Sequence, residues 1–209
     1  MSEETVNRWR ALAGPTAVER VRTLPVAVWG MLMLIATEAA LFAALISSYF
    51  FLRWEGPDAA GWPPGPIPDP KLLRPTVMVG VLVVSGITML VAQGGIRRGR
   101  QGVLAAALGV TLALGLAYVG LQIWNWLEKL EDYTPQTDAH GSLDYLLTGA
   151  HTAHLVVGLL IGGWVLVRAL AGAYRADRRV GVTVAGLYWH FIVLLGIAVY
   201  FTVTVTPHW

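Results

Sequence analysis

The chain of 209 residues contains no cysteine. Disulfides, thiolate-bound metals and a thiolate-bridged copper centre are therefore excluded, because each needs a cysteine sulfur. Charge is also scarce, since Asp, Glu, Lys and Arg make up 13% of the residues, against about 25% in an ordinary soluble domain. A chain with so little charge cannot cover a large water-facing surface, so the composition indicates a protein that meets lipid over much of its surface.

Long uncharged runs occupy most of the sequence, which is 56% hydrophobic. A bilayer core of about 30 Å needs about 20 helical residues to cross it. Five runs reach that length, and they are residues 26–52, 76–95, 102–127, 145–167 and 180–206. The sequence therefore predicts an all-α integral membrane bundle of five transmembrane helices in residues 25–209, after an N-terminal segment 1–24.

Arginine is distributed unevenly, and its distribution predicts the orientation. The segment before the first span, the turn after the second and the turn after the fourth are basic, whereas the other connections hold most of the acids. The positive-inside rule places the N-terminus in the cytoplasm and the C-terminus outside. Because the basic residues follow this membrane pattern, the net charge of +2 does not indicate nucleic-acid binding. The basic N-terminal segment leads directly into a full-length span, as in a signal anchor.

The two connections on the outer side differ in character. Residues 54–70 contain six prolines and three glycines, which disfavour helix and favour a stiff, extended cover over the bundle. Residues 128–142 are acidic, so this second loop is either simply solvated or docks a soluble partner. The two inner turns are short, which predicts that spans two and three, and spans four and five, are antiparallel neighbours.

Glu38 stands inside the first uncharged run, ~20 Å from its start at 1.5 Å per residue. A charged side chain at this depth costs about 2.5–3.5 kcal/mol on insertion scales. We therefore expect Glu38 to carry a proton or to meet a cation or a polar headgroup. Its role is either lipid or proton handling or a hydrogen bond between helices.

The fourth span carries polar and small residues on one stripe, because Thr148, His151, His154, Gly158 and Gly162 recur every three or four positions. The two glycines form a Gly-x-x-x-Gly step, which lets another backbone approach closely. Such a face is expected to meet protein or polar matter rather than lipid tails. The two histidines either make structural hydrogen bonds or serve a headgroup or a proton.

The first span has a small-residue stripe of its own, formed by Ala36, Ala40, Ala43 and Ser47. This stripe suits close helix packing. It is offset from Glu38, so we expect the acid to point in another direction.

His190 lies in the last span at a depth similar to Glu38 and the histidine pair, so contact among these groups is possible. A bis-histidine haem is conceivable from His151 or His154 with His190. Multi-histidine iron centres and a copper–haem centre need more ligands than the five histidines can supply. A two-copper site needs cysteine, which the chain does not contain. We expect no metal on this chain.

Four stretches carry a family resemblance. They are Trp29-Gly-Met-Leu-Met-Leu-Ile-Ala-Thr-Glu38 with the residues up to Arg53, then Trp62-Pro-Pro64, then Gly141–Gly158 with its Thr-Gly-x-His-x-x-His pattern, and Tyr188-Trp-His-Phe191. All four occur in the order found in subunit III of the haem–copper oxidases. From Trp29 to its end the chain resembles this cytochrome c oxidase subunit III family, in its short five-helix form.

The resemblance implies a non-catalytic subunit of a proton-pumping terminal oxidase in a bacterial cytoplasmic membrane. Family members bind no haem or copper, which belong to partner subunits. They pack against catalytic subunit I, hold phospholipid in a cleft, and help to protect the enzyme during turnover. By position, Glu38 matches the family's carbodiimide-reactive glutamate, His151 and His154 match its paired histidines, and His190 matches its last-helix histidine.

Three positions depart from the family pattern. Val193 and Gly196 stand where the family commonly has aspartate and tryptophan, and Asn125 stands where it often has glutamate. The function of those acids is lost or is supplied differently. These departures leave open the alternative that the chain is a subunit III-like homologue associated with nitric oxide reductase. A small b-type cytochrome and an independent proton or solute carrier using Glu38 are the two competing interpretations of the polar groups in the membrane.

Overall fold

The computed structural model describes residues 24–56, 62 and 72–208, and these form five long helices and no strand. All five helices are long and apolar enough to cross a membrane, which confirms the predicted all-α multi-pass bundle. The long helices are α3 (Val26–Glu55), α4 (Leu73–Arg97), α5 (Gln101–Asp132), α6 (Ala139–Leu170) and α7 (Val180–Tyr200). A π-helical segment η1 (Phe201–Val205) and a 3-10 turn η2 (Thr206–His208) extend α7.

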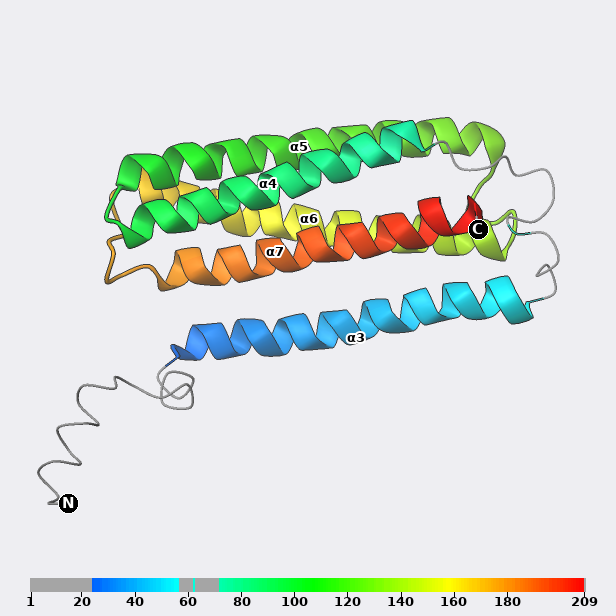
Figure 1. Cartoon of the computed structure of the whole chain (residues 1–209), viewed down its shortest axis with the longest axis horizontal. Helices are drawn as coiled ribbons and strands as arrows, with labels where there is room; N and C mark the ends of the chain where they lie inside the picture. The colour runs from blue at the N-terminus through cyan, green and yellow to red at the C-terminus, as the bar shows by residue number, and fades with distance from the viewer. Residues whose placement is uncertain (1–23, 57–61, 63–71, 209) are drawn as a thin grey trace, which may run out of the picture.

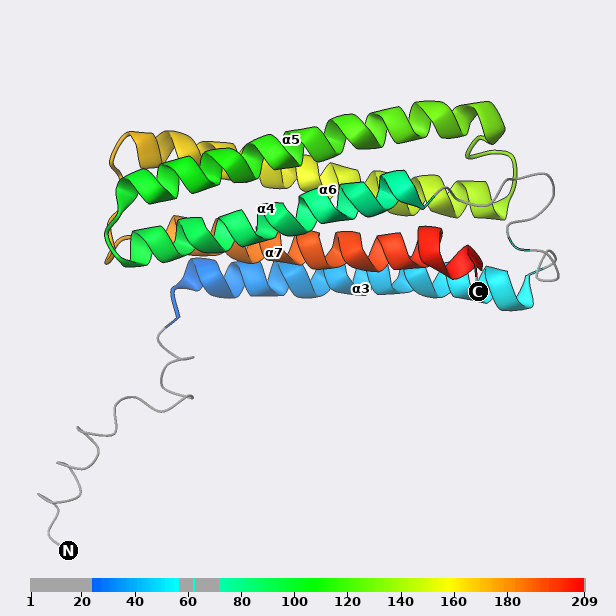
Figure 2. The ribbon, with the colours of Figure 1, turned by 45° about the horizontal axis from the view of Figure 1, so that its top comes forward.

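Helices α4 to α7 form a closed ring, and α3 lies outside it. Neighbouring pairs in the ring are α4 with α5, α5 with α6, α6 with α7, and α7 with α4, whereas α3 contacts α7 and α6. Figures 1 and 2 show α3 running along the bundle beside α7. Within the apolar 18-residue stretch of each span, 56% of the residues are buried in α7 with η1, whereas 17% are buried in α3. The last helix is therefore the centre of the fold.

The antiparallel pairs predicted from the short inner turns are present. Residues 98–100 join α4 to α5, and residues 171–179 join α6 to α7. Gly99 and Gly172 take φ values of 70° and 72° in these two turns, a left-handed conformation that glycine adopts without a Cβ clash.

The helices extend past the predicted apolar runs at the end of the bundle where α5 leads into α6. Helix α5 continues to Asp132 and α6 begins at Ala139, so the acidic loop expected over residues 128–142 is reduced to residues 133–138. Asp138 caps α6 by accepting a hydrogen bond from the Gly141 backbone N–H at 2.7 Å, a usual way to satisfy a free N–H at a helix start. The proline-rich cover expected at residues 54–70 lies almost wholly outside the described residues.

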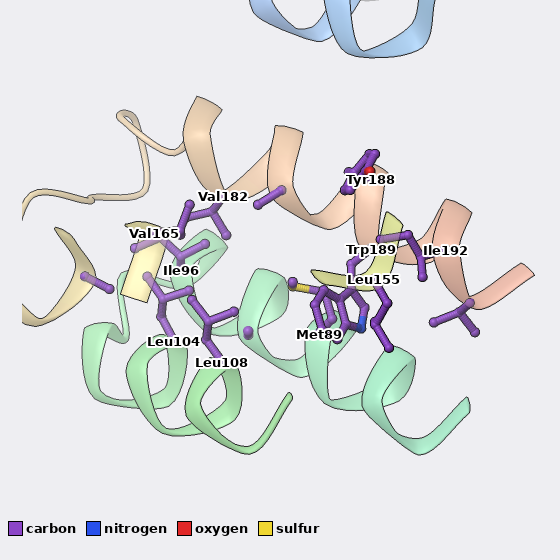
Figure 3. Close-up of a cluster of buried hydrophobic side chains, with 14 of the residues drawn as sticks. Met89, Ile96, Leu104, Leu108, Leu155, Val165, Val182, Tyr188, Trp189 and Ile192 are labelled. Atoms are coloured by element: carbon purple, nitrogen blue, oxygen red, sulfur yellow. The ribbon is translucent and has the colours of Figure 1, made fainter. Parts of the chain in front are cut away.

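The core of the ring is built around Trp189. Its side chain is 1% exposed and packs in one cluster with Met89, Leu155 and Ile192 (Figure 3). The indole N–H donates to Ser85 Oγ at 3.1 Å, and Thr88 and Thr111 share a hydroxyl–hydroxyl contact of 2.7 Å between α4 and α5. In a membrane, where apolar contact alone does not distinguish protein from lipid, such bonds and close packing hold helices together.

A second cluster joins α3 to the ring. Phe42 and Tyr49 of α3 are buried against Leu147 of α6 and Leu195 of α7. Near the C-terminal end of α3, the Arg53 guanidinium donates to the Thr206 backbone carbonyl. These contacts fix the face of α3 that turns toward the ring, and Glu38 lies on it.

Gly158 and Gly162 lie where neighbouring helices approach closely. A Cβ at Gly158 would stand 2.7 Å from Ile192 Cδ1 of α7, and one at Gly162 would stand 2.7 Å from Leu112 Cδ2 of α5. A Cβ at Gly163, one position further along α6, would meet nothing within 4 Å. A larger residue at either of the first two positions would have to displace a side chain of the neighbouring helix, whereas the third position has room for one.

We expect Gly158→Leu to destabilise the chain by about 1–3 kcal/mol, because the added side chain must displace Ile192 from a packed core. Thermal unfolding of the full chain in detergent would measure this effect. Gly163→Leu is the matched control, and we expect it to unfold as the parent chain does. Equal stability of the Gly158 and Gly163 variants would show that α6 and α7 do not pack closely at this point.

Candidate functional site

Glu38 and His154 meet between α3 and α6. Glu38 Oε2 lies 2.9 Å from His154 Nε2, and both groups come from the interior of long membrane helices. The α3 face that carries Glu38 is held against the ring by Phe42, whose ring meets the His154 imidazole edge-on at a centroid distance of 5.3 Å. The acid and one histidine of the predicted pair are thus brought together.

The second nitrogen of His154 determines where its proton lies. Nδ1 is 2.7 Å from the Ala150 backbone carbonyl, which can only accept, so Nδ1 carries hydrogen. Nε2 then either accepts a proton from a neutral Glu38 or donates one to an ionised Glu38. In either case one hydrogen bond joins the two side chains across α3 and α6.

The pair is partly exposed on the surface of the chain. The side chain of Glu38 is 26% exposed and that of His154 is 19% exposed. Tyr188 of α7 also contacts this part of α6, because its hydroxyl donates to the His154 backbone carbonyl at 3.4 Å. The described residues therefore do not enclose the pair completely.

His151 has a different environment. Its side chain is 1% exposed, and its Nε2 lies 3.1 Å from the Ile192 backbone carbonyl, to which it must donate. Nδ1 is left to accept from the Tyr118 hydroxyl at 3.3 Å. Both nitrogens of a neutral ring are therefore engaged, and His151 joins α6 to α5 and α7 instead of facing Glu38.

His190 is not joined to the other sequence-predicted groups by a hydrogen bond in the described residues. Its Nδ1 bonds to the Gly186 carbonyl of its own helix, and its Nε2 is enclosed without a partner. Of the contacts that the sequence left possible among the acid and the three imidazoles, the described residues show a hydrogen bond only between Glu38 and His154.

The small-residue stripe of α3 does not pack against this chain in the described residues. Ala36, Ala40, Ala43 and Ser47 line a side of α3 that is largely open, whereas Glu38 is on the side that turns to the ring. A packing role for Ala36, Ala40 and Ala43 would then need another polypeptide, and it stays a prediction.

A largely buried ion pair between the end of α5 and the start of α6 could not be identified from the sequence. Lys129 Nζ lies 2.7 Å from Asp144 Oδ2, and the Tyr133 hydroxyl donates to the same oxygen at 2.9 Å. The side chain of Asp144 is 1% exposed. Burial and the nearby Asp144 carboxylate raise the pKa of Tyr133 above its usual value, so the phenol stays protonated as a donor. The feature of the sequence that could have indicated this ion pair is the position of Asp144 at the start of an apolar run.

The described residues give little support to a metal or haem site. Among residues 24–56, 62 and 72–208, no three side chains of His, Cys, Asp or Glu come together in a way that could hold a metal ion. Both ring nitrogens of His151 and of His154 already have hydrogen-bond partners. A bis-histidine haem on either one would have to break these bonds.

Comparisons with known proteins agree on one family. The family model for cytochrome c oxidase subunit III matches residues 9–207. A cytochrome c oxidase subunit 3 from Synechocystis sp. is 31% identical over 84% of this chain and 74% of its own length. Proteins of the same name from Patiria pectinifera and Latimeria chalumnae are 26% and 27% identical, each over 93% of this chain and 76% of its own length. The chain therefore belongs to the cytochrome c oxidase subunit III family.

Proposed function

We propose that this chain acts as the non-catalytic subunit III of a haem–copper terminal oxidase, and that the Glu38–His154 pair binds a phospholipid headgroup or a proton beside the catalytic subunit. The family assignment supports the complex, and the 2.9 Å contact between α3 and α6 is the observation that carries the site. Electron transfer and oxygen reduction belong to partner subunits with haem and copper.

The geometry of the pair suits a polar lipid group. A carboxyl group and an imidazole together offer both hydrogen-bond donors and acceptors to a headgroup. Polar side chains at this depth are costly unless they are paired or serve a function, and here the partial exposure of both side chains leaves room for a third partner.

The open stripe of α3 supports contact with another subunit. Ala36, Ala40 and Ala43 leave a flat surface where a second helix can approach closely. Catalytic subunit I is the partner that we propose for it. We further propose the orientation given by the arginines, with the N-terminus in the cytoplasm, in a bacterial cytoplasmic membrane.

Glu38→Gln tests the site with little change in shape. A glutamine amide can still donate to His154 Nε2, so we expect the oxidase to assemble, but the variant can neither ionise nor give up a proton. We expect ~10-fold weaker retention of phospholipid on detergent washing, the effect of losing a charge-assisted hydrogen bond, and faster loss of activity during turnover. Lipid analysis and repeated-turnover assays of the purified oxidase measure the two effects.

Glu55→Gln is the matched control, because Glu55 is an exposed acid at the end of the same helix. It should behave as the parent protein does. If Glu38→Gln also retained its phospholipid and lost activity during turnover no faster than the parent protein, the Glu38–His154 pair would have only a helix-packing role.

Purification of the chain from its native membrane tests the wider assignment. We expect a large subunit containing haem and copper to accompany it, and no b-type band in the reduced-minus-oxidised spectrum of the separated chain. A b-type band in the separated chain would support a small b-type cytochrome instead.

A further inference from the structure

A groove opens between α4 and α5 at the outer end of the bundle, away from the Glu38–His154 pair. Its volume is about 370 Å³. Its walls are the first turns of α4, from Leu73 to Val77, and the last turns of α5, from Leu121 to Asp132, and its floor includes His140 of α6. This groove has no part in the function proposed above.

His140 is an unpartnered polar group at the floor of the groove. Its side chain is 1% exposed, yet neither Nδ1 nor Nε2 has a hydrogen-bond partner among the described residues. The rings of Tyr133 and Trp62 enclose it edge-on at centroid distances of 5.8 and 5.3 Å. A buried polar group without a partner costs free energy, so an imidazole that lines a cavity in this way points to a ligand with a hydrogen-bonding group.

The charged groups of the groove are of both signs. The Arg74 guanidinium lies over the Trp124 ring at 4.5 Å and pairs with Glu128, and Lys129 contacts Asp144 at 2.7 Å. Each cation has further N–H groups beyond the one used in its ion pair. The Asp132 carboxylate is exposed at the rim. Donors for a phosphate and a carboxylate for an ammonium group therefore lie in the same groove.

The remaining wall is apolar and faces the membrane. Leu73, Val77 and Trp124 are 81%, 51% and 58% exposed, and Leu121 continues the same wall. The groove lies at the ends of two membrane helices, which is the headgroup level of a bilayer, where tryptophan is enriched. An acyl chain can thus follow α4 and α5 into the membrane while its headgroup stays at the charged end.

We propose that this groove is a second lipid site, specific for a zwitterionic aminophospholipid. Arg74, Lys129 and His140 bind the phosphate, and Asp132 binds the ammonium group. The apolar wall formed by Leu73, Val77, Leu121 and Trp124 holds the first part of an acyl chain. An anionic lipid such as phosphatidylglycerol would satisfy the donors and leave Asp132 without its cation, so it binds more weakly.

Photolabelling of the intact oxidase complex in lipid nanodiscs tests the proposal. The probes are phosphatidylethanolamine and phosphatidylglycerol, each with a diazirine on the acyl carbons nearest the headgroup, and labelled peptides are identified by mass spectrometry. We expect the phosphatidylethanolamine probe to label peptides within residues 73–77 and 121–132. Arg74→Gln should lower this labelling about tenfold, the effect of losing one strong charge-assisted bond, whereas Arg74→Lys should retain most of it.

Asp132→Asn tests the lipid class with a change at an exposed position that leaves folding intact. We expect it to remove the preference for phosphatidylethanolamine over phosphatidylglycerol. Equal labelling by both probes in the parent protein would overturn the zwitterionic assignment. Labelling that is absent from these peptides, or unchanged in Arg74→Gln, would overturn the site itself.

Glu38→Gln separates this proposal from the function proposed for the pair. It should leave labelling of the groove unchanged, and Arg74→Gln should leave lipid binding at the pair unchanged. Loss of groove labelling in Glu38→Gln would show that the two regions are one site and would overturn the inference.

Discussion

Trp189→Ala is expected to lower the free energy of unfolding by about 3–5 kcal/mol, the cost of removing a large buried aromatic side chain. Trp189 is 1% exposed at the centre of the ring, and its indole N–H bonds to Ser85 of α4. The variant leaves a cavity and removes the donor to Ser85 Oγ, whose hydroxyl keeps its bond to the Leu82 carbonyl. In the parent protein the Trp189 ring also fills the space beside Gly115 of α5, where a Cβ would stand 2.8 Å from it. One substitution therefore loosens α7 from two neighbouring helices.

Trp164→Ala is the control for this prediction, because Trp164 of α6 is 66% exposed. We expect its effect on the separated chain to be small. Reversible unfolding of the full chain in mixed detergent micelles, followed by tryptophan fluorescence and helical circular dichroism, compares the two. If both variants unfolded alike, the ring of four helices would not depend on a core around Trp189.

The five spans could be predicted because a bilayer imposes a length and an apolar composition on any helix that crosses it. Their ends could not be predicted as well. Helix α5 continues to Asp132 and α6 starts at Ala139 because charged residues are compatible with helix once the chain leaves the hydrocarbon. Loss of hydropathy therefore marks the edge of the membrane core and does not mark the end of the helix.

The rotation of α3 was harder to predict than its position. A membrane helix is apolar on every side, so its sequence gives only a weak signal for the face that meets protein. The small-residue stripe with Ala36, Ala40 and Ala43 is the packing face that the sequence favours, yet it is left largely open on this chain. Large residues such as Phe42 and Tyr49 are buried instead, and they carry Glu38 into contact with His154.

Sequence spacing also could not distinguish the roles of the two histidines on α6. His154 follows His151 by three positions, which puts the two side chains about 60° apart around the helix axis. That rotation is enough to place His151 inside the ring against Tyr118 and Ile192, and His154 at its edge against Glu38. Only the position of α3 relative to the ring shows which one has an acid beside it.

The ion pair of Lys129 with Asp144 could not be predicted from the charge pattern that indicates the membrane orientation. The charge pattern places both residues on the outer side of the membrane, at the ends of two spans, where solvation is the simplest expectation. In the structure they form a buried pair that ties the end of α5 to the start of α6. The stabilising partner of each is 15 residues away along the chain, beyond what helical periodicity can reveal.

The second large effect is expected from Asp144→Ala, which should cost about 3–5 kcal/mol of unfolding free energy, because removal of one member of a buried ion pair leaves the other without compensation. Lys129 loses its carboxylate, and the Tyr133 hydroxyl loses its acceptor. Glu131→Ala is the matched control, since Glu131 is an exposed acid at the same end of α5, and we expect a change within about 0.5 kcal/mol.

A double variant separates the charge from the packing at this position. Replacing the pair by Lys129→Met with Asp144→Leu removes both charges and keeps apolar volume, and such replacements of buried ion pairs are often neutral or stabilising. We therefore expect the double variant to recover most of the stability that Asp144→Ala loses, as measured by the same unfolding assay in detergent. If the double variant were as unstable as Asp144→Ala, the hydrogen bond from Tyr133, and not the unpaired charge of Lys129, would account for the loss. Because the pair ties α5 to α6 beyond their apolar runs, the size of this recovery also measures how firmly the end of α5 and the start of α6 are held together.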